Sequence, residues 1–157
     1  MDTKLVKKFP WCFKWDVETM NDGLELPDDT HKVIKAVTGG FQNAYSDKPL
    51  PPNRITTFAL KVTGKAWIKV GVTSNKQVER CFANHDSGWA YFPIKAETRH
   101  ASGENGTKIF SDEISMENIK VSVIFDRIKG HLDFAVNEGI TMTQEHAFSD
   151  SIFADKD

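Results

Sequence analysis

The stretch that decides the fold is residues 119–137, which read IKVSVIFDRIKGHLDFAVN. Its apolar side chains recur at every second position in two runs, Ile119, Val121, Val123, Phe125 and then Leu132, Phe134, Val136. A period of two predicts strands that bury one face and expose the other. Between the runs, Lys129-Gly130 supplies a glycine that accepts positive φ at a turn. The stretch therefore predicts an antiparallel β-hairpin.

The same alternation extends outward through much of the chain. It recurs in residues 9–17, 58–62 and 66–72, and shorter candidates occupy residues 32–37, Gly88–Phe92 and residues 107–110. Turn-forming pairs such as Asp22-Gly23 and Asn105-Gly106, and the proline-rich loop 48–53, separate these runs. Helical signals are confined to residues 116–118 and 144–153. Many short strands with frequent turns predict an all-β antiparallel sandwich with little or no helix.

Length and charge set the size of the fold and the class of partner. A chain of 157 residues predicts one domain, and we expect its core at residues 9–148, with tails at 1–8 and 149–157. The 20 Lys and Arg residues against 22 Asp and Glu residues leave a net charge of −2. Because polyanions are bound by excess positive charge, we expect no nucleic-acid partner.

Cysteine content and hydropathy predict the compartment. The only cysteines are Cys12 and Cys81, too few for a disulfide scaffold. The first ten residues carry three lysines and no apolar run typical of a signal peptide. No apolar run approaches the roughly 18 residues of a membrane span. We therefore expect a cytoplasmic protein without a membrane partner.

The sequence lacks the spacings that carry common catalytic chemistry. It contains neither a phosphate-binding glycine loop nor a G-x-S-x-G nucleophile elbow. Cys81 and His85 are four residues apart, but no second close pair completes a zinc site. Adjacent carboxylates such as Asp28-Asp29 fall in polar, loop-like stretches. We expect no enzymatic activity, no cofactor and no metal.

Residues 9–15 are the one local candidate for a single-strand nucleic-acid surface. Such surfaces interleave aromatic side chains with Lys and Arg on an open sheet face. Here the aromatic residues Phe9, Trp11, Phe13 and Trp15 share one face, while Lys14 lies on the other. No basic patch accompanies them, so the pattern favours core packing.

Five short segments resemble one known family. They are WIKVGV at 67–72, SGWAY at 87–91, IFDRIKGHLDFAVNEG at 124–139, YSDKPL at 45–50 and AF at 147–148. They are similar to the W-x-x-x-G-[VI], S-W-x-Y, L-x-D-x-x-x-G-x-L-x-F-x-x-N-G, S-x-P-L and A-F motifs of SPRY domains, over residues 24–150. The chain departs by an extra Gly88 and an extra Glu138, and by a polar end in place of the family's Y-P motif and last strand.

The resemblance implies a bent, concanavalin-like β-sandwich. It also implies a non-enzymatic module that holds a peptide or partner protein through loops at one edge. The motif residues that match the family have structural roles by this resemblance: Trp67, Gly71, Trp89, Tyr91, Asp126 and Gly130. The sequence leaves open whether residues 9–17 take the place of the missing last strand.

The loops that match the family's recognition edge are residues 42–53, 74–87 and 96–106. Their candidate binding residues are Tyr45, Arg80, His85, Arg99 and His100, because aromatic and arginine side chains dominate interface hot spots. A carbohydrate-binding module is the alternative, since lectins share this architecture and Trp89 and Tyr91 can supply an aromatic platform. A hydrolase on the same scaffold lacks any catalytic constellation.

Overall fold

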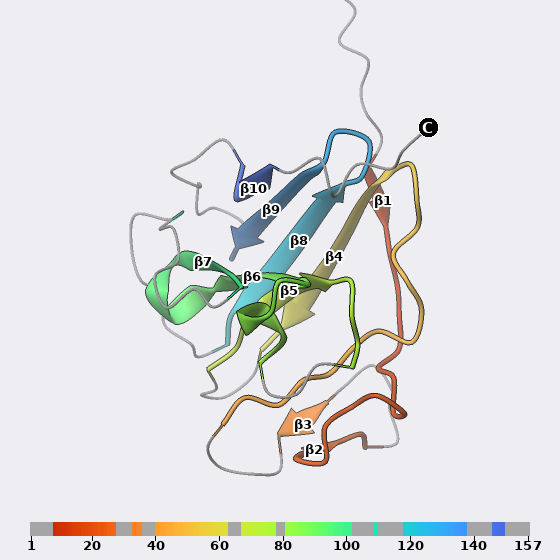
Figure 1. Cartoon of the computed structure of the whole chain (residues 1–157), viewed down its shortest axis with the longest axis vertical. Helices are drawn as coiled ribbons and strands as arrows, with labels where there is room; N and C mark the ends of the chain where they lie inside the picture. Colours follow the sequence, from red (N-terminus) through yellow and green to blue (C-terminus); the bar gives the residue numbers. More distant parts are fainter. Residues whose placement is uncertain are drawn as a thin grey trace, which may run out of the picture.

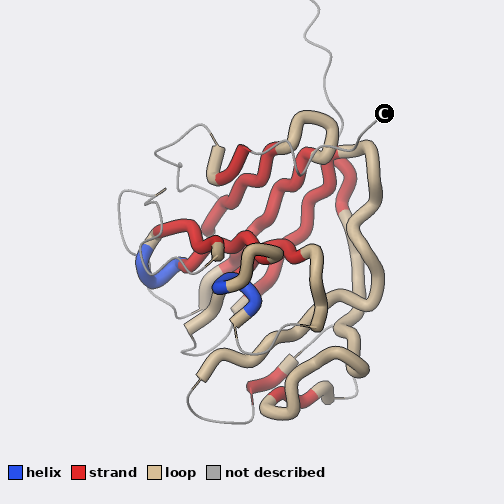
Figure 2. The backbone as a smooth tube through the Cα atoms, viewed as in Figure 1, coloured by secondary structure: helices blue, strands red, loops and turns tan. Residues whose placement is uncertain are grey.

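The computed structural model describes residues 8–27, 33–35, 40–62, 67–77, 81–101, 109, 118–137 and 146–149. Within these ranges the chain forms strands and two short 3₁₀ turns, η1 (Phe82–Asn84) and η2 (Pro93–Lys95), and no α-helix (Figure 2). The prediction of an all-β fold is confirmed. No helix of this described part is long and apolar enough to cross a membrane.

The larger sheet is built around the hairpin at residues 119–137. Strands β4 (Ile55–Lys61), β8 (Lys120–Asp126), β9 (His131–Val136) and β10 (Phe148–Ser149) pair antiparallel in that order (Figure 1). Strand β1 (Lys8–Pro10) joins the edge parallel to β4. The register places Phe58, Val123 and Phe134 in one row across the sheet.

The turn between β8 and β9 is held by Asp126. One oxygen of its carboxylate accepts the backbone N–H groups of Ile128 and Lys129, each at 2.9 Å. Gly130 follows with a φ of 74° and donates its N–H to the Asp126 carbonyl at 2.9 Å. The left-handed region disfavours side chains, so glycine suits this position. The predicted hairpin is confirmed, turn included.

The smaller sheet comprises β5 (Val70–Thr73), β6 (Gly88–Phe92) and β7 (Glu97–His100), all antiparallel. Strand β6 has the bounds that the sequence predicted. A Cβ at Gly71 would overlap the carbonyl oxygen of Trp89, so β5 and β6 need a glycine there. A separate two-stranded ladder joins β2 (Leu24–Glu25) to β3 (Ile34–Lys35).

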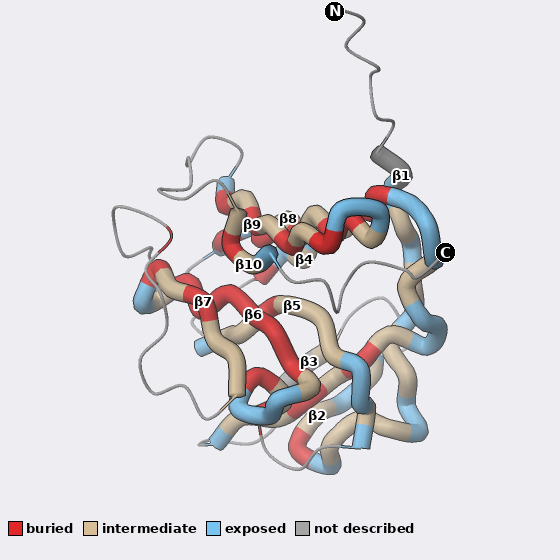
Figure 3. The backbone as a smooth tube through the Cα atoms, turned by 45° about the horizontal axis from the view of Figure 1, so that its top comes forward, coloured by how far each residue is buried: buried red, intermediate tan, exposed pale blue. Residues whose placement is uncertain are grey.

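The two sheets lie over one another and enclose the core. Figure 3 shows β5, β6 and β7 as a layer beside β4, β8 and β9, with β6 buried along its length. The rings of Tyr91 and Phe134 meet between the layers at 5.6 Å. Each large apolar side chain buried in this way contributes about 2 kcal/mol. The core residues drawn from both sheets are Val70, Trp89, Tyr91, Val121, Val123, Phe125, Leu132, Phe134 and Val136.

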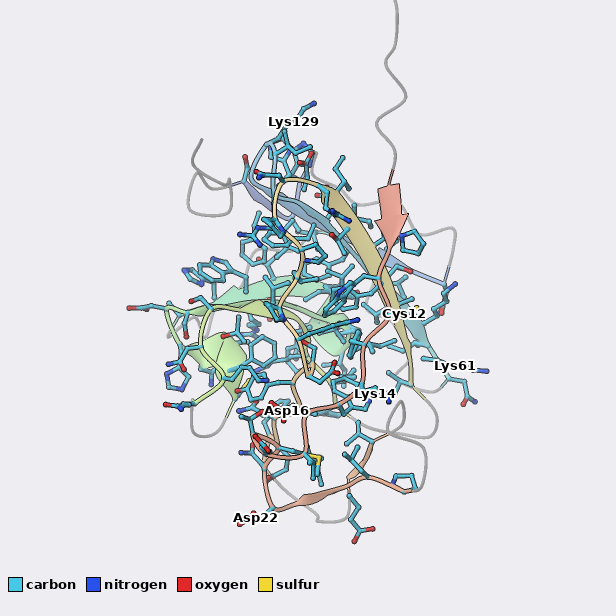
Figure 4. All side chains as sticks on the ribbon, turned by 90° about the vertical axis from the view of Figure 1, so that its right-hand side faces the viewer. Cys12, Lys14, Asp16, Asp22, Lys61 and Lys129 are labelled. Atoms are coloured by element: carbon cyan, nitrogen blue, oxygen red, sulfur yellow. The ribbon has the colours of Figure 1, made fainter. Side chains whose placement is uncertain are left out.

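The N-terminal segment forms less strand than predicted. Of residues 9–17, only Phe9 and Pro10 belong to β1. After them, the Trp11 N–H donates a hydrogen bond to the Thr57 carbonyl at 2.9 Å. Trp15 forms an isolated β-bridge with Ser46. Figure 4 shows this segment descending along the side of the sandwich past Cys12, Lys14 and Asp16. Its position at the sheet edge leaves one flank open to solvent, and the side chains of Trp11, Phe13 and Trp15 are half-buried.

Those side chains form a continuous row on the flank of the sandwich. Trp11 stacks on Phe13 at 4.8 Å, and Phe13 meets Trp15 edge-on at 5.1 Å. Phe58 of β4 lies 5.7 Å from both Trp11 and Phe13. The row packs against Phe58 of β4, which borders the core, but Trp11, Phe13 and Trp15 stay half-buried and outside the described core that the sequence predicted they would fill.

Other predicted segments fall largely outside the described residues. These are the strand at 107–110 apart from Ile109, the helical signals at 116–118 and 144–153, and the tails apart from Lys8 and Ser149. Within the second helical signal, Phe148–Ser149 pairs with β9 as strand β10. The helix prediction is therefore wrong at these two residues, where pairing with an open sheet edge prevails over a weak local signal.

Candidate functional site

The predicted binding residues occupy different parts of the structure. Arg80 lies outside the described residues. Arg99 and His100 belong to strand β7, within a segment predicted as loop 96–106. As neighbours on a strand, they point to opposite faces of the sheet. Arg99 thus lies on the face turned away from the larger sheet, and His100 on the face turned toward it.

Tyr45 is a buried residue. Its side chain is 6% exposed, and its hydroxyl is buried without a hydrogen-bond partner. Burial raises the pKa of the Tyr45 phenol to about 12, and the nearby Cys81 adds to the rise. The described structure therefore offers little of Tyr45 to a partner.

His100 and His85 both stabilise the fold locally. His100 stacks on Trp89 at 4.7 Å, and its Nδ1 lies 2.8 Å from the carbonyl oxygen of Gly88. The ring of Phe148 on β10 lies 6.4 Å from the same imidazole, centre to centre, and nearly perpendicular to it. His85 has an exposed side chain at the end of η1, and its carbonyl accepts the Gly88 N–H at 3.0 Å. Of these two histidines, His85 is the one whose side chain is exposed to solvent.

The motif residues divide into buried positions and one exposed position. Trp89 and Tyr91 belong to the core, and Asp126 is buried beneath the hairpin turn it holds. Trp67, in contrast, is 63% exposed. Trp67 precedes the first paired residue of β5 and lies on the outer side of the smaller sheet.

The outer face of the smaller sheet gathers rings and cations around Phe92. The Phe92 ring is met edge-on by Trp67 at 6.1 Å and by Phe41 at 6.2 Å. The ammonium of Lys69 lies 5.1 Å from the Phe92 ring centre, and the Arg99 guanidinium carbon 5.3 Å. We call Phe41, Trp67, Lys69, Phe92 and Arg99 the Phe92 cluster. Such distances are typical of cation–π contacts.

Sequence reasoning missed most of the Phe92 cluster. Only Arg99 was a candidate binding residue, and Trp67 was given a structural role. The available signal was the period of two, which places Trp67 and Lys69 on one face before β5 and Phe92 on the matching face of β6. Phe41 had no such signal, because it reaches the cluster from a loop distant in the sequence.

Lys69 is the charged residue of this cluster without a carboxylate partner. Its ammonium donates to Cys81 Sγ at 3.3 Å and to Asn84 Oδ1 at 3.4 Å, and it lies 4.2 Å above the Phe41 ring. No carboxylate of the described residues pairs with it. Arg99, by comparison, forms an ion pair with Glu97. Among the described residues, Lys69 therefore has no carboxylate to balance its positive charge at a half-buried position.

A second polar cluster lies on the larger sheet at β9 and β10. His146 Nδ1 lies 3.1 Å from the Asp133 carboxylate, which also accepts the Ala147 N–H at 3.2 Å. The imidazole of His131 stacks on that of His146 at 3.8 Å. Within the described ranges, no group of three His, Cys, Asp or Glu residues is arranged to hold a metal ion. This cluster anchors β10 to β9.

Comparisons with known proteins add no assignment to this geometry. No protein-family model matches the chain. No curated protein matches its sequence either.

Proposed function

We propose that this chain is a SPRY-like, non-enzymatic interaction domain that binds a peptide or partner protein at the Phe92 cluster. The observation that carries the proposal is Trp67, which is 63% exposed and in ring contact with Phe92, the ring that Lys69 and Arg99 also contact. Tryptophan and arginine are enriched among interface hot spots because they combine apolar area with directed polar contacts. An exposed indole that shares the Phe92 ring with two cations is therefore a suitable anchor for a partner.

The family resemblance supports the same proposal. In the structure, two sheets face each other as the resemblance implies, with Trp89 and Tyr91 between them. Asp126 and Gly130 hold the hairpin turn at their motif positions. Function on such a fold comes from the particular site it displays, and here that site is the outer face of the smaller sheet.

No observation favours the carbohydrate-binding alternative. Sugar-binding surfaces need aromatic rings exposed to solvent, whereas Trp89 and Tyr91 are both buried. Those two residues were the platform on which the alternative depended. The proposal therefore keeps a protein or peptide as the partner.

The test selects peptides from a random displayed library on the purified chain and measures the affinity of the enriched peptides. Trp67→Ala is the variant, and Ile128→Ala is the matched control, because Ile128 is 57% exposed at the β8–β9 turn. We expect Trp67→Ala to weaken binding about tenfold or more, a typical hot-spot loss. Ile128→Ala should leave affinity unchanged, and both variants should unfold at the wild-type temperature. Equal binding by both variants, or no enriched peptide, contradicts the proposal.

A further inference from the structure

We infer that the Phe92 cluster takes an acidic segment of a partner, with a carboxylate on the Lys69 ammonium and an apolar side chain covering Trp67. This inference rests on the proposed function, because it names the partner class of the same surface. It adds Lys69 as the residue that determines specificity. The half-buried ammonium of Lys69 is complementary in charge to a partner carboxylate.

The first step concerns the hydrogen bonds of Lys69. An ammonium has three N–H donors and no acceptor. Described residues take two of them, through Cys81 Sγ at 3.3 Å and Asn84 Oδ1 at 3.4 Å. Neither acceptor is a carboxylate. A partner carboxylate fits the remaining donor and forms a charge-assisted hydrogen bond.

The second step concerns the position of the ammonium. Burial of an unpaired charge is costly, and the ring faces of Phe41 and Phe92 offset only part of that cost. Those rings lie 4.2 and 5.1 Å from Lys69 Nζ, and they restrict where the ammonium can lie. A fixed, incompletely paired cation is prepared to bind an anion with little further ordering.

Trp67 and Lys69 lie close enough together for one short peptide segment to contact both. The Trp67 ring and the Lys69 ammonium lie 6.1 and 5.1 Å from the same Phe92 ring. An extended peptide rises about 3.3 Å per residue, so a segment of about three residues spans both positions. One short segment can therefore place a carboxylate on Lys69 and an apolar side chain on Trp67.

The local charges favour a single carboxylate over a polyanion. Arg99, the other cation of the cluster, is already paired with Glu97. The carboxylate of Glu97 would repel a run of closely spaced negative charges. The chain as a whole carries a net charge of −2, which also disfavours a nucleic acid.

The experiment uses the peptides enriched on the wild-type chain. Each acidic peptide is compared with its counterpart in which Asp or Glu is replaced by Asn or Gln, against wild type and Lys69→Met. Methionine keeps an unbranched apolar chain between the two rings and removes the charge. We expect the amide peptide to bind wild type about tenfold more weakly, as for loss of a charge-assisted contact. Lys69→Met should bind both peptides equally weakly, and higher salt should weaken only the acidic peptide on wild type.

The outcomes separate the inference from the proposed function. Peptides that require Trp67 but show no enrichment in acidic residues, or no coupling to Lys69, overturn the acidic inference alone. If Lys69→Met fails to fold, the comparison of acidic and amide peptides on wild type still tests the inference. Weaker binding of the amide peptide supports it, and equal binding of the two peptides overturns it. Binding of neutral glycans at Trp67, or self-association that Trp67→Ala abolishes, overturns the inference in favour of those occupants. The absence of any peptide that depends on Trp67 overturns both proposals.

Discussion

Lys76 donates from its ammonium to the carboxylate of Asp16, a residue 60 positions earlier in the chain. The same ammonium donates to the carbonyl oxygen of Ser46 at 2.9 Å, and the Asp16 N–H bonds the Tyr45 carbonyl at 2.8 Å. Lys76 therefore joins the N-terminal segment, the loop at residues 43–47 and the segment after β5. Asp16 lies on the side of the sandwich in Figure 4.

The Asp16–Lys76 pair predicts a loss of stability at low pH. The hydrogen bond from Lys76, followed by that from Thr19, holds the pKa of Asp16 below its usual 3.8. A carboxyl with a lowered folded-state pKa stabilises the fold above its unfolded pKa, and this stabilisation is lost as pH falls through the folded value. Asp16→Asn should lower the free energy of unfolding by about 1 kcal/mol near neutral pH.

Denaturant unfolding across the acid range measures this prediction. The difference between wild type and Asp16→Asn should shrink as Asp16 becomes protonated. Asp22→Asn is the control, since Asp22 is exposed nearby in the chain. A difference that stays constant down to the acid limit contradicts the assignment of the effect to the Asp16 charge.

Asp126 predicts a graded effect of substitution at the β8–β9 turn. Asp126→Ala removes the acceptor of the Ile128 and Lys129 N–H groups, which are both at 2.9 Å. We expect a loss of about 2 kcal/mol in unfolding free energy, as for hydrogen bonds to a charged group. Asp126→Asn keeps one side-chain oxygen in place and should cost less. Equal losses in the two variants, measured by denaturant unfolding, argue against the turn contact as the cause.

The chain's only two tyrosines predict an unusual alkaline titration. Burial raises the pKa of Tyr45 from 10.0 to about 12 and raises that of Tyr91 further. The folded protein should therefore show almost no tyrosinate absorbance near pH 10, where the unfolded chain is half ionised. Because the unfolded state loses these protons first, stability is complete below pH 10.0 and declines as pH rises toward the folded pKa values.

The phenol of Tyr45 provides the control for that titration. Its hydroxyl is buried without a hydrogen-bond partner, so Tyr45→Phe should preserve or raise stability near neutral pH. It should also remove the tyrosinate step nearest pH 12 and leave the later one. A tyrosinate signal near pH 10 in the folded wild type would show that Tyr45 or Tyr91 is open to solvent.

The contact between Tyr91 and Phe134 allows the packing of the two sheets against each other to be tested. Their rings are 5.6 Å apart with an interplanar angle of 33°. A double-mutant cycle of Tyr91→Leu and Phe134→Leu should give a coupling of about 1 kcal/mol, typical of aromatic pairs. Additive losses would mean that the rings do not touch. The pair Tyr91 and Ile128, the latter at the hairpin tip, is the control and should be additive.

Much of the larger sheet was predictable because pattern and fold agree there. Strand β8 places Val121, Val123 and Phe125 in the core at every second residue, and Asp126 begins the turn that its side chain holds. Strand β7 shows the opposite case. Its sequence, Glu97–His100, is polar and lacks alternation, so it was predicted as a loop, and backbone pairing with β6 makes it a strand.

The sequence by itself determined the fold class, the β8–β9 hairpin and strand β6, because local periodicity and turn chemistry specify which side chains are buried. Tertiary structure alone decided the candidate site. Phe41, Trp67, Lys69 and Arg99 come from separate segments and meet only where β5, β6 and β7 pair around Phe92. Whether a charge meets a carboxylate, and whether an indole is exposed, depends on neighbours that come together only on folding.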